Sequence, residues 1–177
     1  AMSNLSKDLR TKLSESYTIP KVKIHHSQFS SDGTIKCRFQ LHDGHFVEGV
    51  LIPTEKRLTA CVSSQVGCSL SCKFCATGTM DRKRNLTYDE IYDQVVLLNK
   101  ESERIFEKKL SNIVFMGMGE PLLNYDNVLK AVERISAEDG LFMSPRRITV
   151  STAGVSKQIR KLGDDKVRFK LALSLHA

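Results

Sequence analysis

The sequence of 177 residues lacks any long hydrophobic run, any internal repeat and any low-complexity tract. No stretch approaches the roughly 20 apolar residues that a helix needs to cross a bilayer, and no charged and apolar leader is visible at the start. Hydrophobic and charged residues make up 41% and 27% of the sequence, proportions typical of a globular protein. These features argue against a transmembrane helix, and we expect a cytoplasmic protein.

The chain carries an excess of positive charge. Lysine and arginine number 27 against 20 aspartates and glutamates, which gives a formal net charge of +7 and an isoelectric point near 9.2. A basic protein attracts polyanions, because neutralising phosphates releases condensed counterions and the protein's field steers association. The charge favours a nucleic-acid partner, although many basic proteins bind no nucleic acid.

Cysteine is scarce outside one short segment. Four of the five cysteines lie between residues 61 and 75, and the fifth is Cys37, which we interpret as structural. An odd number clustered in this way is a poor disulfide framework, and in a reducing compartment it favours metal binding or catalysis. Within the cluster, Cys68, Cys72 and Cys75 have the spacing C-x3-C-x2-C.

The sequence also lacks the further ligands that a structural zinc site needs. Such a site uses four ligands, usually from two C-x2-C pairs, but no second pair and no C-x2-C…H-x3-H pattern occurs. A 4Fe–4S cluster in an electron carrier takes four cysteines. Three cysteines would leave one iron open to a small molecule, and an open position is what a catalytic metal centre keeps. The spacing favours such a cluster, with a zinc knuckle or a redox sensor as the alternatives.

Two regions with different hydrophobic periods divide the chain, and we predict one unit over residues 1–53. It should begin with a short amphipathic helix that has Leu5, Leu9 and Leu13 on one face and is ended by Pro20. An antiparallel meander should follow, with strands in KVKIHH, TIKCRFQL and HFVEGVLIP separated by SSDG and HDG turns.

The second predicted unit, residues 54–177, alternates between strands and helices. We predict strands in RLTACVSS, SNIVFMG, RRITVST and VRFKLALSL, and helices in TYDEIYDQVVLLNKESERIF, NYDNVLKAVERISAED and VSKQIRKLGDD. Thr87 and Glu90 should form a capping box, and Gly163 should end the last helix. The order β-α-β-α-β-α-β predicts parallel strands with right-handed crossovers. Because the last strand has no helix after it, we expect a truncated piece of a longer protein with an open sheet edge.

Four motifs in this order resemble one enzyme family: ACVSSQVGCSLSCKFCATG, FMGMGEPLLNYDNV, RRITVSTAG and LALSLHA. Over roughly residues 3–177 the chain resembles the RlmN/Cfr family of radical S-adenosylmethionine (SAM) methyltransferases, and the RlmN type more closely. The resemblance implies an α/β fold, namely the first half (about four βα strands) of a radical SAM partial (β/α)6 barrel behind a short helix and a small meander. It also implies a 4Fe–4S cluster on Cys68, Cys72 and Cys75, with SAM bound to the free iron.

The resemblance assigns further residues to SAM. Gly119 and Glu120 would hold its amino end, although GMGEP could instead be an ordinary βα turn. Four residues at the ends of the later strands would line the rest of the pocket: Ser151, Ser174, Leu175 and His176. Taken alone, a serine in VSTAG carries little information, and a histidine at this position could be a core residue.

Two residues would act on the substrate. Cys61 matches a thiol that resolves a covalent enzyme–RNA intermediate, and Glu48 matches the base that removes a proton from the attacked carbon. The alternatives are a buried structural thiol and a solvated surface carboxylate. The basic run 82–84 would meet phosphates, which position a nucleic acid without specifying its sequence, or would be a solvated charge run.

In the family, one SAM methylates a cysteine near the C-terminal end, and a second SAM yields a radical that abstracts hydrogen from that methyl group. The carbon is then added to an adenosine of 23S ribosomal RNA and, for the RlmN type, of transfer RNA; we expect carbon 2 of the adenine, and the sequence itself leaves carbon 8 as the alternative. The target base must first leave its stack. The resemblance further implies a monomer and an electron donor such as flavodoxin. No cysteine here matches the methyl carrier, so we expect the chain alone to be inactive; a non-catalytic iron–sulfur, SAM-binding or zinc-binding module is the alternative.

Overall fold

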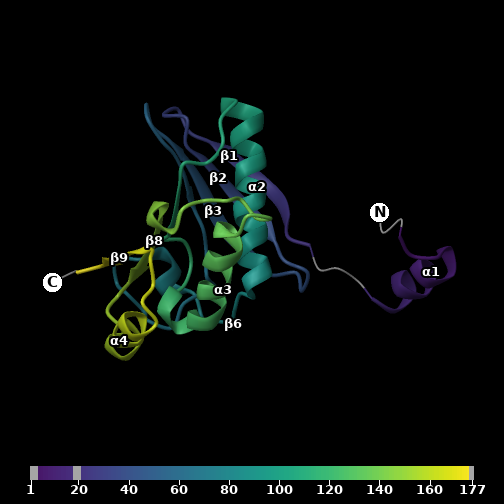
Figure 1. The fold of residues 1–177 in the computed structure, drawn as a ribbon. Coiled ribbons are helices and arrows are strands. Elements are labelled where there is room, and N and C mark those ends of the chain that lie inside the picture. The colour runs from purple at the N-terminus through teal and green to yellow at the C-terminus, as the bar shows by residue number, and fades with distance from the viewer. Residues whose placement is uncertain (1–3, 18–20, 176–177) are drawn as a thin grey trace.

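The computed structural model describes residues 4–17 and 21–175. Helix α1 (Lys7–Ser16) begins at Ser6, whose Oγ accepts a hydrogen bond from the Leu9 amide at 3.3 Å. The predicted helix is confirmed, but none of its residues is buried and it lies apart from the rest of the chain (Figure 1). Its leucines therefore do not join the core. Pro20, which we expected to end the helix, lies outside the described residues.

Seven strands form one sheet in the order β1-β2-β3-β4-β7-β8-β9. The meander consists of β1 (Lys23–Phe29), β2 (Ile35–Gln40) and β3 (Phe46–Pro53), all antiparallel. The parallel strands are β4 (Leu58–Cys61), β7 (Asn112–Phe115), β8 (Ile148–Thr152) and β9 (Lys170–Leu173). Because β3 also pairs antiparallel with β4, the meander and the parallel strands share one sheet. The predicted α/β fold is confirmed.

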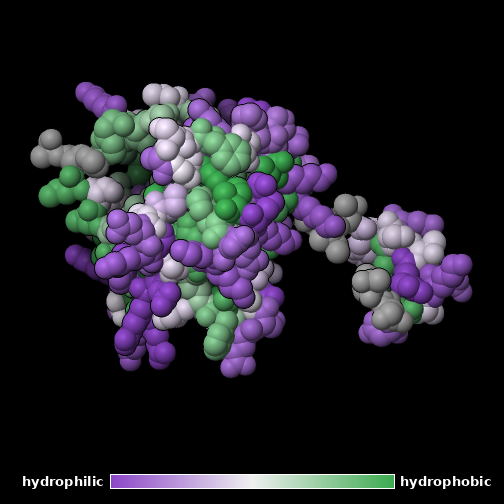
Figure 2. Space-filling model, turned by 90° about the horizontal axis from the view of Figure 1, so that it is seen from above, coloured by the Kyte–Doolittle hydropathy of each residue, from purple (hydrophilic) through white to green (hydrophobic). Residues whose placement is uncertain are grey.

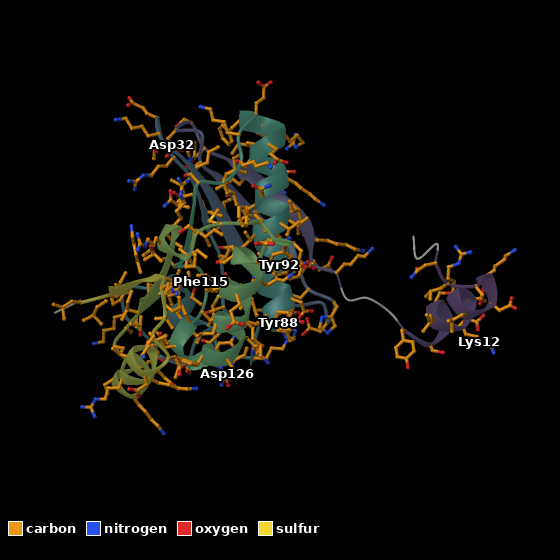
Figure 3. The ribbon with its side chains drawn as sticks, viewed as in Figure 1. Lys12, Asp32, Tyr88, Tyr92, Phe115 and Asp126 are labelled. Carbon is orange, nitrogen blue, oxygen red and sulfur yellow. The ribbon has the colours of Figure 1, made fainter. Side chains whose placement is uncertain are left out.

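Three helices cover one face of this sheet (Figure 1): α2 (Tyr88–Phe106), α3 (Tyr125–Ser136) and α4 (Ser156–Asp164). The core lies between them and the strands, where Phe115 is almost fully buried while Asp32 and Asp126 lie at the periphery (Figure 3). The capping box is confirmed, since the Thr87 amide donates to Glu90 Oε2 at 3.0 Å. Among the described residues, no helix combines the length and hydrophobicity needed to cross a membrane.

The opposite face of the sheet carries no helix in the described part of the chain. In strand β2, Ile35, Cys37 and Phe39 are buried on the helix-covered side, whereas Lys36 and Arg38 on the other side are exposed. Side chains of successive strand residues point to opposite faces. We call this open side the helix-free face.

Short elements complete the structure. A second sheet pairs β5 (Gln65–Val66) with β6 (Arg84–Asn85), and three 3-10 helices are η1 (Ala76–Thr79), η2 (Pro121–Asn124) and η3 (Pro145–Arg147). The sequence did not predict β5 and β6, because two-residue strands are too short to show a hydrophobic period. Their pairing brings together the two ends of the segment that carries three cysteines.

The prediction that Gly163 ends the last helix was wrong. Helix α4 continues to Asp164, and the left-handed residue is Lys166, with φ of 49°. The Lys166 amide donates to the Gly163 carbonyl at 3.2 Å, and the next amide, of Val167, donates to the carbonyl of Leu162. Val167 packs against the core, so this packing sets where the chain must turn. Left-handed helix ends usually use glycine or asparagine, and here a lysine takes that conformation.

Strand β9 forms one edge of the sheet, as expected. Its Leu171 and Leu173 are 42% and 58% exposed. Figure 2 shows hydrophobic side chains gathered on the side of the molecule that lies away from α1. An apolar edge strand offers unpaired backbone groups to any further strand.

Candidate active site

The cysteine-bearing loop follows β4, at the carboxyl end of the first parallel strand. The β5–β6 pairing closes this loop at its base, with Gln65 opposite Asn85 and Val66 opposite Arg84. Gly67 lies just inside the closure with φ of +73°, and an added Cβ there would collide with the backbone of Asp81. The loop is therefore anchored at both ends, at the rim where barrel enzymes build their active sites.

Inside the loop the backbone folds tightly around the three thiols. The Cys75 amide donates to the Cys72 carbonyl at 3.0 Å, and the Cys68 amide donates to the Met80 carbonyl at 3.3 Å. A Cβ on Gly78 would lie 2.6 Å from the Cys72 carbonyl oxygen, so only glycine fits this approach. All three cysteines are free and half-buried, and thus open to a ligand from solvent.

The cysteine-bearing loop supplies three free thiols. Within residues 4–17 and 21–175, no three histidine, cysteine or acidic side chains converge closely enough to hold one metal ion. In a cubane cluster each thiolate binds a different iron atom. The ligand sulfur atoms are therefore spaced around the cluster and do not converge on one ion. Three free thiols with the C-x3-C-x2-C spacing are the number and kind of ligand that a cluster with one open iron requires.

Gly119 and Glu120 follow β7 and lie at the same rim. Gly119 has φ of +94°, and an added Cβ would lie 2.6 Å from Cγ of Gln65. The buried Glu120 carboxylate accepts from the Leu122 amide at 3.0 Å through Oε1 and from the Ala153 amide at 2.8 Å through Oε2. Each carboxylate oxygen has two acceptor sites, so Glu120 keeps capacity for an ammonium group.

Of the remaining predicted residues, those that the structure describes lie at the ends of β8 and β9. Ser151, at the end of β8, donates its hydroxyl to the Phe115 carbonyl at 2.7 Å. The Ser174 amide donates to the Thr152 carbonyl at 2.9 Å, and its side chain is exposed beside Leu175, which is 84% exposed. His176 lies outside the described residues.

Glu48 and Cys61 share the helix-free face. Val50 is the register partner of Cys61, and Glu48 precedes Val50 by two residues on β3, so all three side chains point the same way. Glu48 is half-exposed, and its Oε1 pairs with Lys36 Nζ at 2.8 Å. Burial raises the pKa of the Cys61 thiol to about 11 and outweighs the opposing effect of a hydrogen bond with the Met116 backbone. Cys37 points to the opposite, helix-covered face, and burial raises the pKa of its thiol as well.

Sequence reasoning missed the polar side chains that join these loops. The buried Gln65 accepts from the Glu120 amide at 2.9 Å and donates to Asn85 Oδ1 at 2.7 Å, and Asn85 in turn donates to the Leu123 carbonyl at 3.2 Å. Gln65 therefore connects the base of the cysteine loop to the Gly119–Glu120 turn. A single glutamine in SSQVGC gives no signal of this, because its partners lie 20 and 55 residues away.

Arg84 was expected to meet phosphates or solvent, but it is held by two carboxylates. Its Nε donates to Asp43 Oδ2 at 2.6 Å, and its Nη atoms donate to both oxygens of Glu90 at 2.7 and 2.8 Å. Hydrogen bonds from Arg84 hold the pKa of Asp43 well below its usual range. Burial alone would raise the pKa of Glu90, but the bonds from Arg84 and Thr87 outweigh burial and lower it. This ion pair joins the meander turn to the end of the cysteine loop.

Known proteins resemble the chain in both sequence and structure. It is 62% identical over 99% of its length to a protein of Cytophaga hutchinsonii called "Probable dual-specificity RNA methyltransferase RlmN", and 60% identical over 99% to a protein of the same name from Flavobacterium psychrophilum. The chain covers 48% and 51% of those proteins, so it spans about half the length of the curated relatives it matches. The resemblance to RlmN proteins is thus confirmed.

A solved structure agrees. The crystal structure of a radical SAM methyltransferase from Sphaerobacter thermophilus superposes with a TM-score of 0.89 at 42% identity, over 99% of this chain and 52% of that one. The family model described as "Radical SAM superfamily" matches residues 62–173, which include the cysteine loop, the Gly119–Glu120 turn and Ser151. This match covers more than half of the sequence and its motifs lie at one rim of the sheet; the chain belongs to the radical SAM superfamily.

Proposed function

We propose that this chain is the cluster-bearing part of a radical SAM enzyme that methylates carbon 2 of an adenosine in 23S ribosomal RNA and in transfer RNA. The observation that carries the proposal is the 46–62% identity, over 98–100% of the chain, to eight proteins that bear the RlmN name. The net charge of +7 suits an RNA substrate.

Cys68, Cys72 and Cys75 would hold the 4Fe–4S cluster, and Gly119 and Glu120 would hold the amino end of SAM. When bound, the cluster supplies the electron that cleaves SAM to a 5′-deoxyadenosyl radical. Glu120 is suited to bind an ammonium group, since a charge-assisted hydrogen bond to a buried carboxylate is strong. Its carboxylate is already fixed by two amides, so it would meet SAM without rearranging. Four further residues would complete the pocket: Ser151, Ser174, Leu175 and His176.

Glu48 and Cys61 would act on the RNA. Glu48 is half-exposed on the helix-free face, where a carboxylate can reach a bound base and accept its proton. Cys61 lies on the same face, but its thiol with a pKa of about 11 stays protonated at neutral pH. Its role as the resolving thiol therefore requires a base to take its proton when the intermediate forms.

The cluster assignment is tested by anaerobic reconstitution with iron and sulfide. The wild-type chain should bind about four irons, and Cys68→Ala, Cys72→Ala or Cys75→Ala should abolish the absorbance of the cluster. Cys61→Ala and Cys37→Ala are matched controls that should retain it, because neither residue lies in the loop. Zinc in place of iron and sulfide, or cluster loss in Cys61→Ala with retention in a loop variant, would contradict the assignment.

The RNA reaction is tested by tritium transfer from the SAM methyl group to 23S ribosomal RNA under anaerobic conditions with a strong reductant. The five cysteines are already assigned as three cluster ligands, one resolving thiol and one structural thiol. None remains to carry the methyl group, so the chain alone should leave the RNA unlabelled.

The positive counterpart in this test is a chimera: the Cytophaga hutchinsonii relative with its corresponding region replaced by this chain. It should label the RNA, and mass spectrometry should place the methyl group on carbon 2 of adenine. Label with the chain alone would refute the cysteine assignment. An inactive chimera beside an active parent would refute the function.

A further inference from the structure

A shallow hollow on the helix-free face of the meander lies beside Glu48. It is lined by residues from three neighbouring strands: His26, Gln28, Lys36, Arg38 and Glu48. The register places His26 and Glu48 on either side of Arg38, and Gln28 opposite Lys36. Glu48 is the only carboxylate among these residues, so the hollow is basic apart from the proposed proton acceptor.

Three exposed side chains at the border of this hollow contact one another. The Arg38 guanidinium lies 4.8 Å from the centroid of the Phe46 ring, and its Nη2 lies 2.9 Å from His25 Nδ1. The His25 ring meets the Phe46 ring edge-on, with centroids 5.1 Å apart. All three residues are exposed to solvent. We call His25, Arg38 and Phe46 the meander platform.

The two cations in the hollow differ in their charge partners. Lys36 is paired with Glu48 at 2.8 Å, whereas the Arg38 guanidinium lies against Phe46 and His25 and forms no ion pair with any carboxylate in the described part of the chain. Arg84, by comparison, is neutralised by Asp43 and Glu90. Arg38 therefore presents a planar, positively charged group that is available to an anionic or aromatic partner.

We propose that the meander platform binds single-stranded RNA, stacking the base of a nucleotide next to the target adenosine. Unpaired bases are recognised by stacking on aromatic rings and guanidinium planes, and the platform supplies both. The phosphate beside that base would meet Arg38 and His26, since phosphate contacts position the strand. Glu48 lines the same hollow, so this contact would deliver the neighbouring adenine to the proposed base. The inference rests on RNA being the substrate and locates where it docks.

The test is fluorescence anisotropy of a labelled ten-nucleotide single-stranded RNA titrated with the chain at several salt concentrations. Phe46→Leu removes the ring and should weaken binding about 5- to 160-fold, the range for loss of one stacked base, with the salt slope unchanged. Arg38→Gln should weaken binding similarly and also lower the salt slope by about one. Arg38→Lys, which keeps the charge and loses the plane, should restore the slope but not the affinity. Arg160→Gln, an exposed arginine on α4, is the matched control and should change the affinity less than twofold.

Circular dichroism and thermal unfolding serve as the folding control for each variant. We expect every variant to fold, because the side chains of the platform are exposed. Equal weakening in Arg160→Gln and Arg38→Gln, full affinity in Phe46→Leu, or no RNA binding by the wild-type chain would each overturn the proposal. The proposed function is judged separately by tritium transfer in the chimera. Transfer that Arg38→Gln leaves unchanged refutes the platform alone, whereas RNA binding that depends on the platform without any transfer refutes the reaction alone.

Discussion

Gly119→Ala should destabilise the chain strongly even without cofactors, because two costs coincide at this position. The residue has φ of +94°, a conformation that costs a residue with a Cβ about 1–3 kcal/mol. The new Cβ would also lie 2.6 Å from Cγ of Gln65, whose side chain is fixed by Glu120 and Asn85 and cannot swing away. Overpacking of this kind costs about 1–3 kcal/mol. Together the free energy of unfolding should fall by about 2–6 kcal/mol, or Tm by roughly 4–24 °C for a chain of this length.

Two other glycines separate these costs in the same urea-unfolding assay. Gly44 has φ of +83° but nothing within 4 Å of an added Cβ, so Gly44→Ala should show the backbone cost alone. Gly163 lies in α4 with ordinary φ and open space, so Gly163→Ala should stabilise the chain by up to about 1 kcal/mol. If Gly119→Ala unfolds no more easily than Gly44→Ala, the close packing between Gly119 and Gln65 is refuted.

Four further outcomes are expected. With iodoacetamide at pH 8, mass spectrometry should find the three loop thiols alkylated well before Cys61 and Cys37, whose thiol pKa values are raised by burial; equal rates would contradict the burial of Cys61. Arg84→Met leaves the Glu90 carboxylate buried without its partner and should lower the free energy of unfolding by about 3 kcal/mol in urea. The folded state lowers the pKa of Glu90, so the ionised carboxylate stabilises the fold above its unfolded pKa of about 4.3. This stabilisation should be lost as the pH falls through the pKa of Glu90 in the folded state, and acid titration followed by circular dichroism would detect the loss. Glu120→Gln can accept only one of the two amide hydrogen bonds, so it should cost about 1–3 kcal/mol of stability and weaken SAM binding in calorimetry; unchanged values for both would make Glu120 a simple turn residue.

Local sequence patterns predicted most of the helices and strands and the order of the loops at the candidate site. They could do so because hydrophobic periods, caps and turns depend on residues close together in the sequence. The capping box at Thr87 and the alternation along β2 are examples, and the C-x3-C-x2-C spacing drew attention to the cysteine loop. Contacts between distant residues could not be predicted in this way. Gln65 bonds to Glu120, 55 residues away in the sequence, and Arg84 bonds to Asp43, 41 residues away. Neither contact follows from a hydrophobic period or a motif. The same limit applies to Ser151, whose hydroxyl bonds to the Phe115 carbonyl 36 residues away.

The junction of antiparallel and parallel strands at β3 and β4 has a consequence for the folding pathway. Strands β1 to β4 pair with their sequence neighbours through short turns, whereas β4 meets β7 only after about 50 intervening residues have been brought back. Closing a long loop costs more entropy than closing a short one, so local pairings form sooner. We expect the meander to fold first and to present β4 as a ready edge on which β7, β8 and β9 are added in order. Pulse-labelled hydrogen exchange should therefore protect the β2–β3 amides before those of β8, and simultaneous protection would contradict this order.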